Sequence, residues 1–201
     1  MPEERGAECR APPPVAPLVG ELRDGRRCEI FFLAQQPHLV ESCSRLCFAE
    51  FEAAYRDLGF DSAAAVAANL CKSYLNRDKV PLVLVALARD GEFLGTVTLD
   101  EEDMRTRPEL TPWVADLLVV PAARGQGVAS VLMRALLAVS KTIGVDKLYL
   151  WTEKQAAFFA RRGFERVDRL ECAGATAMLM CSSLTQADET LDETAFLKFS
   201  A

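Results

Sequence analysis

The sequence predicts one α/β (α+β) domain, built on a mixed, mostly antiparallel twisted sheet of about six to seven strands with about four flanking helices. Residues 113–151 have the pattern of strand, loop, helix and strand, which predicts a βαβ unit with two parallel strands. Residues 80–99 contain two apolar runs joined by a short Asp-Gly turn, and residues 165–184 contain two strand-like segments joined at Ala-Gly-Ala, which predicts antiparallel hairpins. The 201 residues suffice for one domain with a sizeable core.

The two ends of the chain differ in composition from this domain. Residues 1–20 are rich in proline and hold little to bury, so we expect a disordered, Pro-rich N-terminal segment. They also lack the basic and apolar regions of a signal peptide. Residues 185–201 carry several acidic side chains and are expected to form an acidic C-terminal tail. The folded domain is therefore predicted to span residues 28–184.

The first half of the domain begins with an apolar run at residues 28–33, which predicts a strand. Apolar side chains then recur at helical spacing over residues 37–55, and proline suits the first turn of that helix. Asp61 and Ser62 suit the N-cap of a second helix, which is expected to continue to about Leu75.

A hairpin follows. Its strands are expected at residues 80–88 and 93–99, with Asp-Gly in the turn and a bulge at Gly95. The next segment, Asp100 to Asp103, is acidic. It is interpreted either as a solvated loop or as a mouth that attracts an amine, and the sequence leaves both open.

The central segment starts with an apolar, valine-rich strand at residues 113–120, which Pro121 ends because proline has no amide hydrogen for a sheet ladder. A helix is expected from Val128 to a C-cap at Gly144. The remaining elements are a strand at 147–151, a short helix at 155–162, and strands at 165–172 and 176–184.

The loop between the central strand and its helix is the strongest chemical signal. It reads Arg-Gly-Gln-Gly-Val-Ala over residues 124–129. A helix start has amide hydrogens without partners and positive partial charge, and two glycines let backbone approach a ligand closely. The loop therefore predicts a cradle for a phosphate or diphosphate, although a plain solvated turn would have the same sequence.

Two other phosphate-binding patterns fit this loop less well. The P-loop ends in Gly-Lys-Ser/Thr, which is absent here. The dinucleotide fingerprint G-x-G-x-x-G is met in part, with Ser130 at its third glycine and Glu153 where a ribose-binding acid would lie. That fingerprint normally follows its strand directly near the start of a domain, so a dinucleotide-dependent oxidoreductase remains a distant hypothesis.

A family pattern fits better. The sequence R-G-Q-G-V-A resembles R/Q-x-x-G-x-G/A, the acyl-CoA diphosphate loop of the GNAT superfamily of N-acetyltransferases. A second block, over residues 148–164, resembles that superfamily's strand followed by N-x-x-A-x-x-F-Y-E-K-x-G-F. The segment from Glu102 to Trp113, with EDM and RPELTPW, is similar to small bacterial-type GNAT enzymes. The resemblance covers roughly residues 28–184.

The resemblance implies a GNAT fold, in which two parallel strands splay apart and admit the pantetheine arm of acetyl-CoA. It implies acetyl-CoA as cosubstrate and no metal. Backbone groups of the central strand would hold the pantetheine and thioester, and the loop would hold the diphosphate. Two downstream positions correspond to the second block but depart from it, with Thr152 where many members have asparagine and Phe159 where they have tyrosine. The implied cofactor-binding residues are Leu117, Leu118, Val119, Arg124, Gly125, Gln126, Gly127, Val128, Ala129, Ser130, Thr152 and Phe159.

The catalytic groups are less well specified. Family members often place a tyrosine general acid where this chain has Phe159, which has no hydroxyl. By its position on the central strand, Asp116 is the best-placed carboxylate for a general base, and Glu153 and the acidic cluster are the next candidates. A strand-face aspartate with a local partner is the alternative. His38, the single histidine, is expected to be a surface or cap residue.

The net charge and the cysteine content limit the classes of partner and the cellular compartment that we expect. A net charge of −6 without a basic stripe excludes nucleic acid and suits an amine acceptor. No apolar run is long enough for a membrane span. Seven scattered cysteines without a C-x-x-C predict free thiols in the cytoplasm. Cys43, Cys47 and His38 lack a fourth ligand for a metal, and the oligomeric state stays open, with a homodimer as one option.

The resulting functional hypothesis is an acetyl-CoA-dependent N-acetyltransferase that moves an acetyl group directly to a primary amine of a small molecule or peptide in a ternary complex. The alternative is a GNAT-fold domain that binds acyl-CoA without turnover, as a sensor or interaction module. Phe159 at the usual tyrosine position is the feature that favours the alternative.

Overall fold

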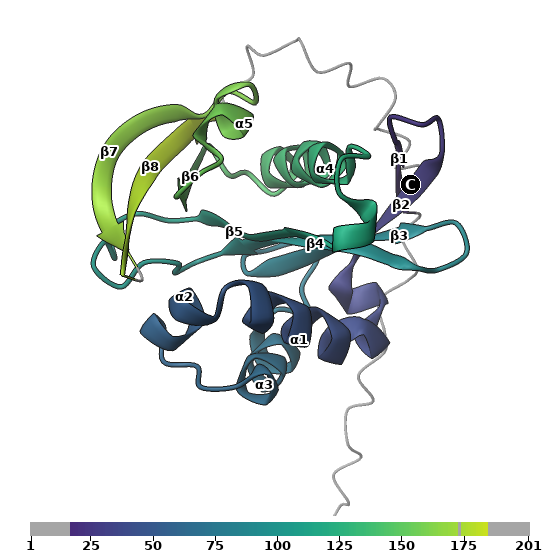
Figure 1. Cartoon of the computed structure of the whole chain (residues 1–201), viewed down its shortest axis with the longest axis horizontal. Coiled ribbons are helices and arrows are strands. Elements are labelled where there is room, and N and C mark those ends of the chain that lie inside the picture. Colours follow the sequence, from purple (N-terminus) through teal and green to yellow (C-terminus); the bar gives the residue numbers. More distant parts are fainter. Residues whose placement is uncertain (1–16, 173, 185–201) are drawn as a thin grey trace, which may run out of the picture.

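The computed structural model describes residues 17–172 and 174–184. In this part of the chain, eight strands form a sheet with the order β1-β2-β3-β4-β5-β6-β8-β7. Neighbouring strands are antiparallel except β5 and β6, which are parallel. The predicted fold class is therefore confirmed: a mostly antiparallel sheet with one parallel pair and flanking helices (Figure 1).

The elements follow the chain in this order. The strands are β1 (Leu18–Glu21), β2 (Arg27–Phe32), β3 (Leu82–Ala88), β4 (Phe93–Asp100), β5 (Trp113–Val119), β6 (Lys147–Thr152), β7 (Glu165–Cys172) and β8 (Ala175–Ser183). The α-helices are α1 (Val40–Glu50), α2 (Glu52–Asp57), α3 (Ala63–Ser73), α4 (Val128–Thr142) and α5 (Ala156–Ala160). Short 3-10 turns are η1 (Leu33–Gln35), η2 (Pro37–Leu39) and η3 (Pro121–Ala123).

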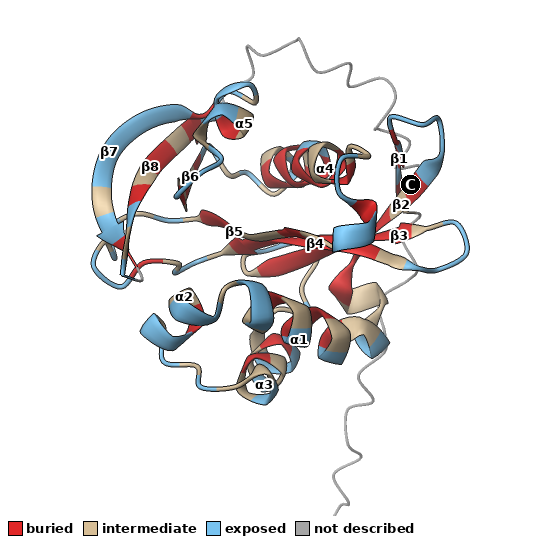
Figure 2. Ribbon diagram, in the orientation of Figure 1, coloured by how far each residue is buried: buried red, intermediate tan, exposed pale blue. Residues whose placement is uncertain are grey.

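Helices cover both faces of the sheet: α1, α2 and α3 lie on one face, and α4 and α5 on the other (Figure 1). Successive side chains of a strand point to opposite faces. In β3, Leu82, Leu84 and Ala86 therefore join the core under α4, while Val83 and Val85 join the core under α1 and α3. The sheet-facing side of α4 and the central strands form the buried interior (Figure 2).

The two parallel strands, β5 and β6, have almost no pairing with each other. β5 and β6 share the single register position Trp113↔Tyr149, next to a hydrogen bond of 3.0 Å from the Tyr149 amide to the Pro112 carbonyl. β6 instead pairs along its whole length with β8. Beyond Trp113 the two strands part, and the sheet opens between them (Figure 1).

A bulge lies on β5 beside this opening. Thr98 pairs with Ala115, but Thr96 pairs with Leu118, so β5 has one residue more than β4 between these positions. Asp116 lies in the bulge with φ of 50°. Aspartate tolerates this left-handed region better than most residues because its short polar side chain forms local hydrogen bonds.

The predicted bulge at Gly95 is confirmed, because Ala86 pairs with Gly95 and Leu87 with Phe93, which leaves Leu94 out of the ladder. A methyl group at Gly95 would lie 2.4 Å from the Leu118 carbonyl oxygen. The backbones of β4 and β5 therefore approach so closely here that only glycine fits.

Two predicted boundaries are wrong. The N-terminal segment was expected to stay disordered to residue 20, but Leu18–Glu21 form β1, in which Leu18 is buried against the sheet. A strand of four residues after a proline-rich stretch gives too short a pattern to detect. The single helix expected over 37–55 breaks at Phe51, which leaves helical geometry and separates α1 from α2. Residues 1–16 and 185–201, where the lead-in and the acidic tail were predicted, lie outside the described residues.

Candidate active site

A continuous cavity of about 1250 Å³ follows the opening in the sheet. The β5–α4 loop and the first turn of α4 line one end, and α2, α3 and the acidic segment after β4 line the other. The middle is formed by β5 from Val114 to Val119 and by the end of β6. The cavity thus connects both faces of the sheet through the gap that the parallel strands leave.

The β5–α4 loop presents backbone amides at its end of the cavity. Gly125 and Gly127 have φ of 79° and 97°, a region that favours glycine. Gly127 is the N-cap of α4, and no side chain caps this helix start. The amides of residues 125–129 donate no hydrogen bond within the described chain. The loop is therefore a free set of donors at the positive end of a helix of 15 residues.

The β1–β2 turn holds this loop from outside. The Arg23 amide donates to the Gln126 carbonyl oxygen at 2.9 Å, and Arg26 Nη2 donates to Gln126 Oε1 at 2.6 Å. Gln126 Nε2 in turn donates to the Ala122 carbonyl at 2.9 Å. The Gln126 side chain therefore braces the loop from behind, and it is absent from the cavity lining that the other predicted site residues share.

Arg124 lies over the end of β5. Its Nε donates to the Val119 carbonyl at 3.0 Å, and its Nη2 forms an ion pair with Glu50 Oε2 at 3.1 Å. Glu50 ends α1, so the guanidinium connects the loop to the helical layer on the opposite face. The two side chains are about half exposed, so the pair itself contributes little to stability.

Asp116 lines the cavity near the opening in the sheet. Tyr55 Oη donates to Asp116 Oδ2 at 2.7 Å, and Thr98 Oγ1 donates to the same oxygen at 3.3 Å. Burial raises the pKa of Asp116 to about 6, and the charge of Asp100 acts in the same direction, while the hydrogen bonds from Tyr55 and Thr98 oppose the rise. Oδ1 accepts no hydrogen bond in the described chain, so the carboxylate is poised to exchange a proton near neutral pH.

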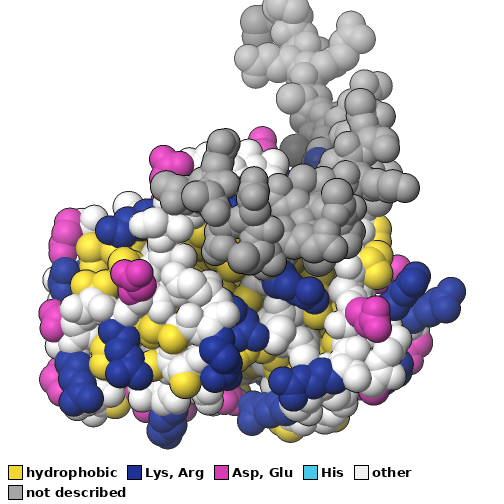
Figure 3. Space-filling view, turned by 90° about the horizontal axis from the view of Figure 1, so that it is seen from above, with side chains coloured by type: hydrophobic (Ala, Val, Ile, Leu, Met, Phe, Trp, Pro, Cys, Tyr) yellow, Lys and Arg dark blue, Asp and Glu magenta, His cyan; other side chains and the backbone are white. Residues whose placement is uncertain are grey.

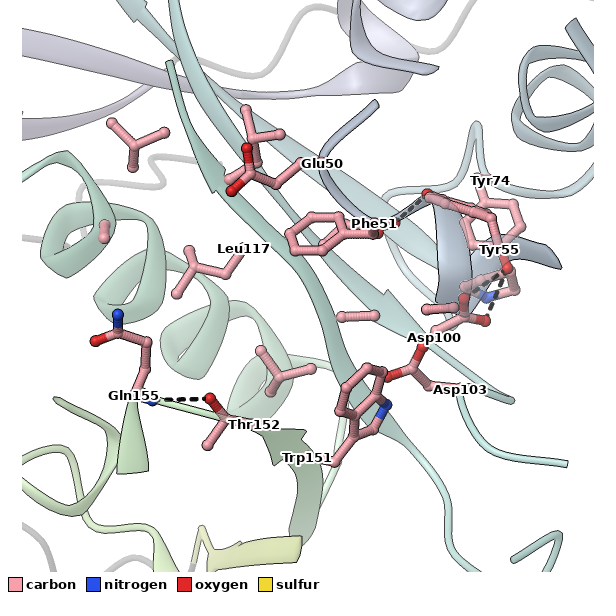
Figure 4. Close-up of a pocket in the computed structure, with 18 of the residues that line it drawn as sticks. Glu50, Phe51, Tyr55, Tyr74, Asp100, Asp103, Leu117, Trp151, Thr152 and Gln155 are labelled. Carbon is pink, nitrogen blue, oxygen red and sulfur yellow. Dashed lines mark hydrogen bonds between the residues drawn. The ribbon is translucent and has the colours of Figure 1, made fainter. Parts of the chain in front are cut away.

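Two further carboxylates belong to the same end of the cavity. Tyr74 Oη donates to both oxygens of Asp100, at 2.8 and 2.7 Å. Burial raises the pKa of Asp100, and burial together with repulsion from Asp116 and Asp100 raises the pKa of Asp103 well above its usual value. Figure 4 shows Asp100 and Asp103 on the same side of the cavity as the two tyrosines, with Trp151 beside Asp103. The acidic segment from Asp100 to Asp103 therefore lines one end of the cavity.

The downstream residues Thr152 and Phe159 both line the cavity. Thr152 Oγ1 accepts a hydrogen bond of 3.1 Å from the Gln155 amide and so orders the turn that leads into α5. Phe159 is buried and packs edge-to-face on Phe158 and Phe164, with ring centroids 5.1 and 5.9 Å apart. Phe159 therefore supplies apolar surface.

The residues that the sequence analysis missed are Tyr55, Tyr74, Glu50, Arg23 and Arg162. Two of the chain's three tyrosines form these Asp pairs, and their position on the predicted helices was the available signal. Glu50 and Tyr55 lie on either side of the break at Phe51, and a continuous helix would have directed one of them differently.

Comparison with known proteins agrees with this architecture. The model of the Acetyltransferase (GNAT) family matches residues 41–164. N-alpha-acetyltransferase 30 of Schizosaccharomyces pombe is 39% identical over 90 residues, which are 43% of this chain and 59% of that protein. The chain thus matches about six tenths of that relative's length.

Solved structures show the same fold at low sequence identity. The GNAT domain of S. lividans PAT has a TM-score of 0.59 at 19% identity, covering 83% of this chain and 96% of that one. A putative GNAT-family acetyltransferase from Bordetella pertussis has 0.61 at 20% identity, covering 82% and 99%. An aminoglycoside 6'-N-acetyltransferase complexed with coenzyme A has 0.60 at 15% identity, covering 77% and 96%.

Among the described residues, no helix is both long and apolar enough to cross a membrane. The family match extends from α1 through α4 and α5 and so includes the loop, the parted strands and the carboxylates just described. The chain belongs to the Acetyltransferase (GNAT) family.

Proposed function

We propose that this protein transfers an acetyl group from acetyl-CoA to a primary amine of a small molecule or peptide, with both substrates bound at once. The observation that carries the proposal is the continuous cavity through the parted strands. It joins a loop of free amide donors on one face of the sheet to a group of carboxylates on the other.

The loop end of the cavity fits the diphosphate of coenzyme A. The glycines at 125 and 127 keep side chains out of the approach to the amides, and the dipole of α4 favours an anion at its N-terminus. Leu117, Leu118 and Val119 line the cavity between this loop and Asp116, where strand β5 has no ladder partner on the β6 side. An extended, amide-containing arm would satisfy backbone groups along this edge.

The other end fits an amine. When bound, acetyl-CoA supplies an acetyl group activated as a thioester. Asp116 accepts a proton from the acceptor's ammonium group, either directly or through water, and so provides the neutral amine that attack requires. Tyr55 and Thr98 hold the carboxylate in place through Oδ2 and leave Oδ1 for this proton. Phe159 has no hydroxyl, so the departing sulfur takes its proton from water or from another group.

The acceptor class follows from charge. Asp100, Asp103 and Asp116 line this end of the cavity, and an incoming cation favours their ionised forms, so this end attracts cations. The name of the S. pombe relative, N-alpha-acetyltransferase 30, supports peptide N-termini as one part of the class to be tested. The cysteines in the described part of the chain are free thiols, which supports our proposal that the enzyme acts in the cytoplasm.

The test is a thiol-release assay with acetyl-CoA and a panel of small amines, diamines and peptides with free or blocked N-termini. We expect release of CoA that depends on a free primary amine, with the acetylated product identified by mass spectrometry. Thermal stabilisation by CoA without turnover across the panel would instead favour an acyl-CoA-binding sensor. Stabilisation by NAD and not by CoA would overturn both functions.

A further inference from the structure

Arg162 is held against the wall of the cavity at the end of α5. Its Nη1 donates to the Phe158 carbonyl at 2.6 Å, and its Nη2 donates to Ser130 Oγ at 2.5 Å. The guanidinium lies 3.5 Å from the centroid of the Phe158 ring. Ser130 and Phe158 line the cavity next to the β5–α4 loop, so Arg162 is fixed within reach of a ligand on that loop.

Further arginines surround this position. Arg23, in the β1–β2 turn, lines the cavity beside the loop, and its Cγ lies 3.4 Å from where a Gly127 Cβ would be. Burial lowers the pKa of Arg162, and repulsion from Arg161, Arg134 and Arg23 lowers it further. Dark blue Lys and Arg side chains lie in the middle of this face of the molecule as well as toward its edges (Figure 3).

Three of these arginines have no carboxylate partner in the described part of the chain. Arg23, Arg161 and Arg162 form no ion pair with a described carboxylate, whereas Arg124, on the β5–α4 loop, is paired with Glu50. Holding several guanidinium groups together without an anion is unfavourable. An anionic ligand would remove the repulsion.

We propose that Arg23 and Arg162 bind the phosphate on the 3′ position of the ribose of coenzyme A, so that the protein discriminates CoA from dephospho-CoA. This inference rests on the proposed function. Coenzyme A carries two kinds of phosphate: a diphosphate within its chain and a terminal monoester on the ribose. The free amides of the loop and the α4 dipole serve the diphosphate, and the unpaired guanidiniums beside them remain for the monoester.

Guanidinium chemistry suits this terminal group. A phosphate monoester has a double negative charge near neutral pH and three exposed oxygens, and arginine binds such oxygens through paired N–H donors. The Phe158 ring and the Ser130 hydroxyl fix the plane of Arg162 in advance, so little side-chain freedom is lost on binding. The turn that carries Arg23 is itself fixed to the loop by the bond between its amide and Gln126.

The experiment compares the binding of CoA and dephospho-CoA by isothermal titration calorimetry. We expect the wild-type protein to bind CoA at least about tenfold more tightly. R162Q and R23Q should each reduce this preference several-fold, and the double variant should approach equal affinity for the two ligands. The affinity for dephospho-CoA should change less than about threefold in all of them, because this ligand lacks the group that the arginines bind.

R89Q is the matched control, because Arg89 is an exposed residue of the β3–β4 turn and its loss changes the net charge equally. It should keep the full preference for CoA. Equal wild-type affinity for the two ligands would overturn the inference while leaving the proposed function intact. So would a parallel loss of both affinities in R23Q and R162Q, which would assign the arginines to the diphosphate. A wild-type protein that binds neither ligand would overturn the proposed function together with the inference.

Discussion

The chemistry of Asp116 depends on the conformation of its backbone. In a regular strand the residue would alternate into one face of the sheet, but the bulge gives it φ of 50° and places its carboxylate on the cavity. Tyr55 reaches it from α2 and Thr98 from β4, so two elements fix a single oxygen. The result is a carboxylate with a raised pKa and one free oxygen, as a base for an ammonium group requires.

The first prediction concerns the base itself. D116N should lower kcat/KM by about 10² to 10⁴, because asparagine keeps the size and the tolerance of positive φ but accepts no proton. In the wild type, kcat/KM should rise with pH through a midpoint near 6, where Asp116 ionises. Steady-state kinetics between pH 5 and 9, with one amine acceptor, measure both effects.

Tyr55 offers a control for this assignment. Its hydrogen bond lowers the pKa of Asp116, so Y55F should move the midpoint of the pH profile upward while the activity at high pH is largely kept. A profile whose midpoint is the same in Y55F and wild type would argue against Asp116 as the titrating group. Unchanged kcat/KM in D116N would remove it from the mechanism.

The same residue predicts a pH dependence of stability. Folding raises the pKa of Asp116 from 3.8 to about 6, so the folded state binds the proton more tightly than the unfolded state. The resulting stabilisation is complete below about pH 4 and is lost as the pH rises through 6. D116N avoids this loss, so relative to wild type it should gain up to about 3 kcal/mol in free energy of unfolding between pH 4 and pH 8. Urea unfolding of both proteins at the two pH values tests this, and a difference independent of pH would contradict it.

At the scale of elements, the loop and the first turn of α4 act as one unit. Two glycines with positive φ turn the chain, and the helix then starts without a side-chain cap. An uncapped start is unfavourable for a helix on its own, because its first amides remain without partners. Amides without partners are useful at this helix start if a bound ligand provides the cap.

A carboxylate placed in this first turn should therefore compete with the ligand. A129E should weaken CoA binding by about a hundredfold or more while leaving the fold stable, because an acidic residue near a helix N-terminus favours the helix. A129Q adds a similar side chain without charge and should weaken binding far less. Calorimetric titration with CoA and thermal unfolding of both variants provide the comparison. Equal losses in A129E and A129Q would indicate crowding, and normal binding by A129E would show that the loop does not hold the anion.

Some elements were predictable because their local signals agree. The strand at 113, the loop and α4 follow from an apolar run, a proline, two glycines and a long helical repeat, all within about thirty residues. β1 was missed because four residues carry too little pattern, and the break at Phe51 because no glycine or proline marks it. Tertiary packing decides such features: Phe51 packs against the core under α1 and α3, and this packing overrides the local helical repeat.

The site as a whole was predictable only in its cofactor half. Glycines and a helix start leave a signature in the sequence, whereas the pairing of Tyr55 with Asp116, 61 positions apart, depends on the three-dimensional arrangement of α2 and β5. The same holds for the cluster of arginines, whose members come from the β1–β2 turn, α4 and the end of α5. Contacts between such distant segments become visible only once the sheet has ordered them.

At the scale of the whole molecule, the sheet consists of two parts. β1 to β5 form one continuous antiparallel ladder, and β6, β8 and β7 form another. The two ladders pair at the single position Trp113↔Tyr149. Helix α4 connects β5 of the first ladder to β6 of the second. A ligand that occupies the opening would contact both ladders, so its binding should stabilise their association.

The last prediction follows from this arrangement of two ladders. At a hundredfold excess over its Kd, acetyl-CoA should add about 2.7 kcal/mol to the free energy of unfolding and raise Tm by about 5 °C or more. Hydrogen exchange should slow at the amides of residues 117–119, where β5 lacks a partner on the β6 side, because the extended arm of the cosubstrate would replace the missing strand. The amides of β3, which already pair with β2 and β4, serve as the internal control and should change little. Protection confined to the β5–α4 loop, without any effect on residues 117–119, would mean that the cosubstrate binds at the surface and does not enter the opening between the two ladders.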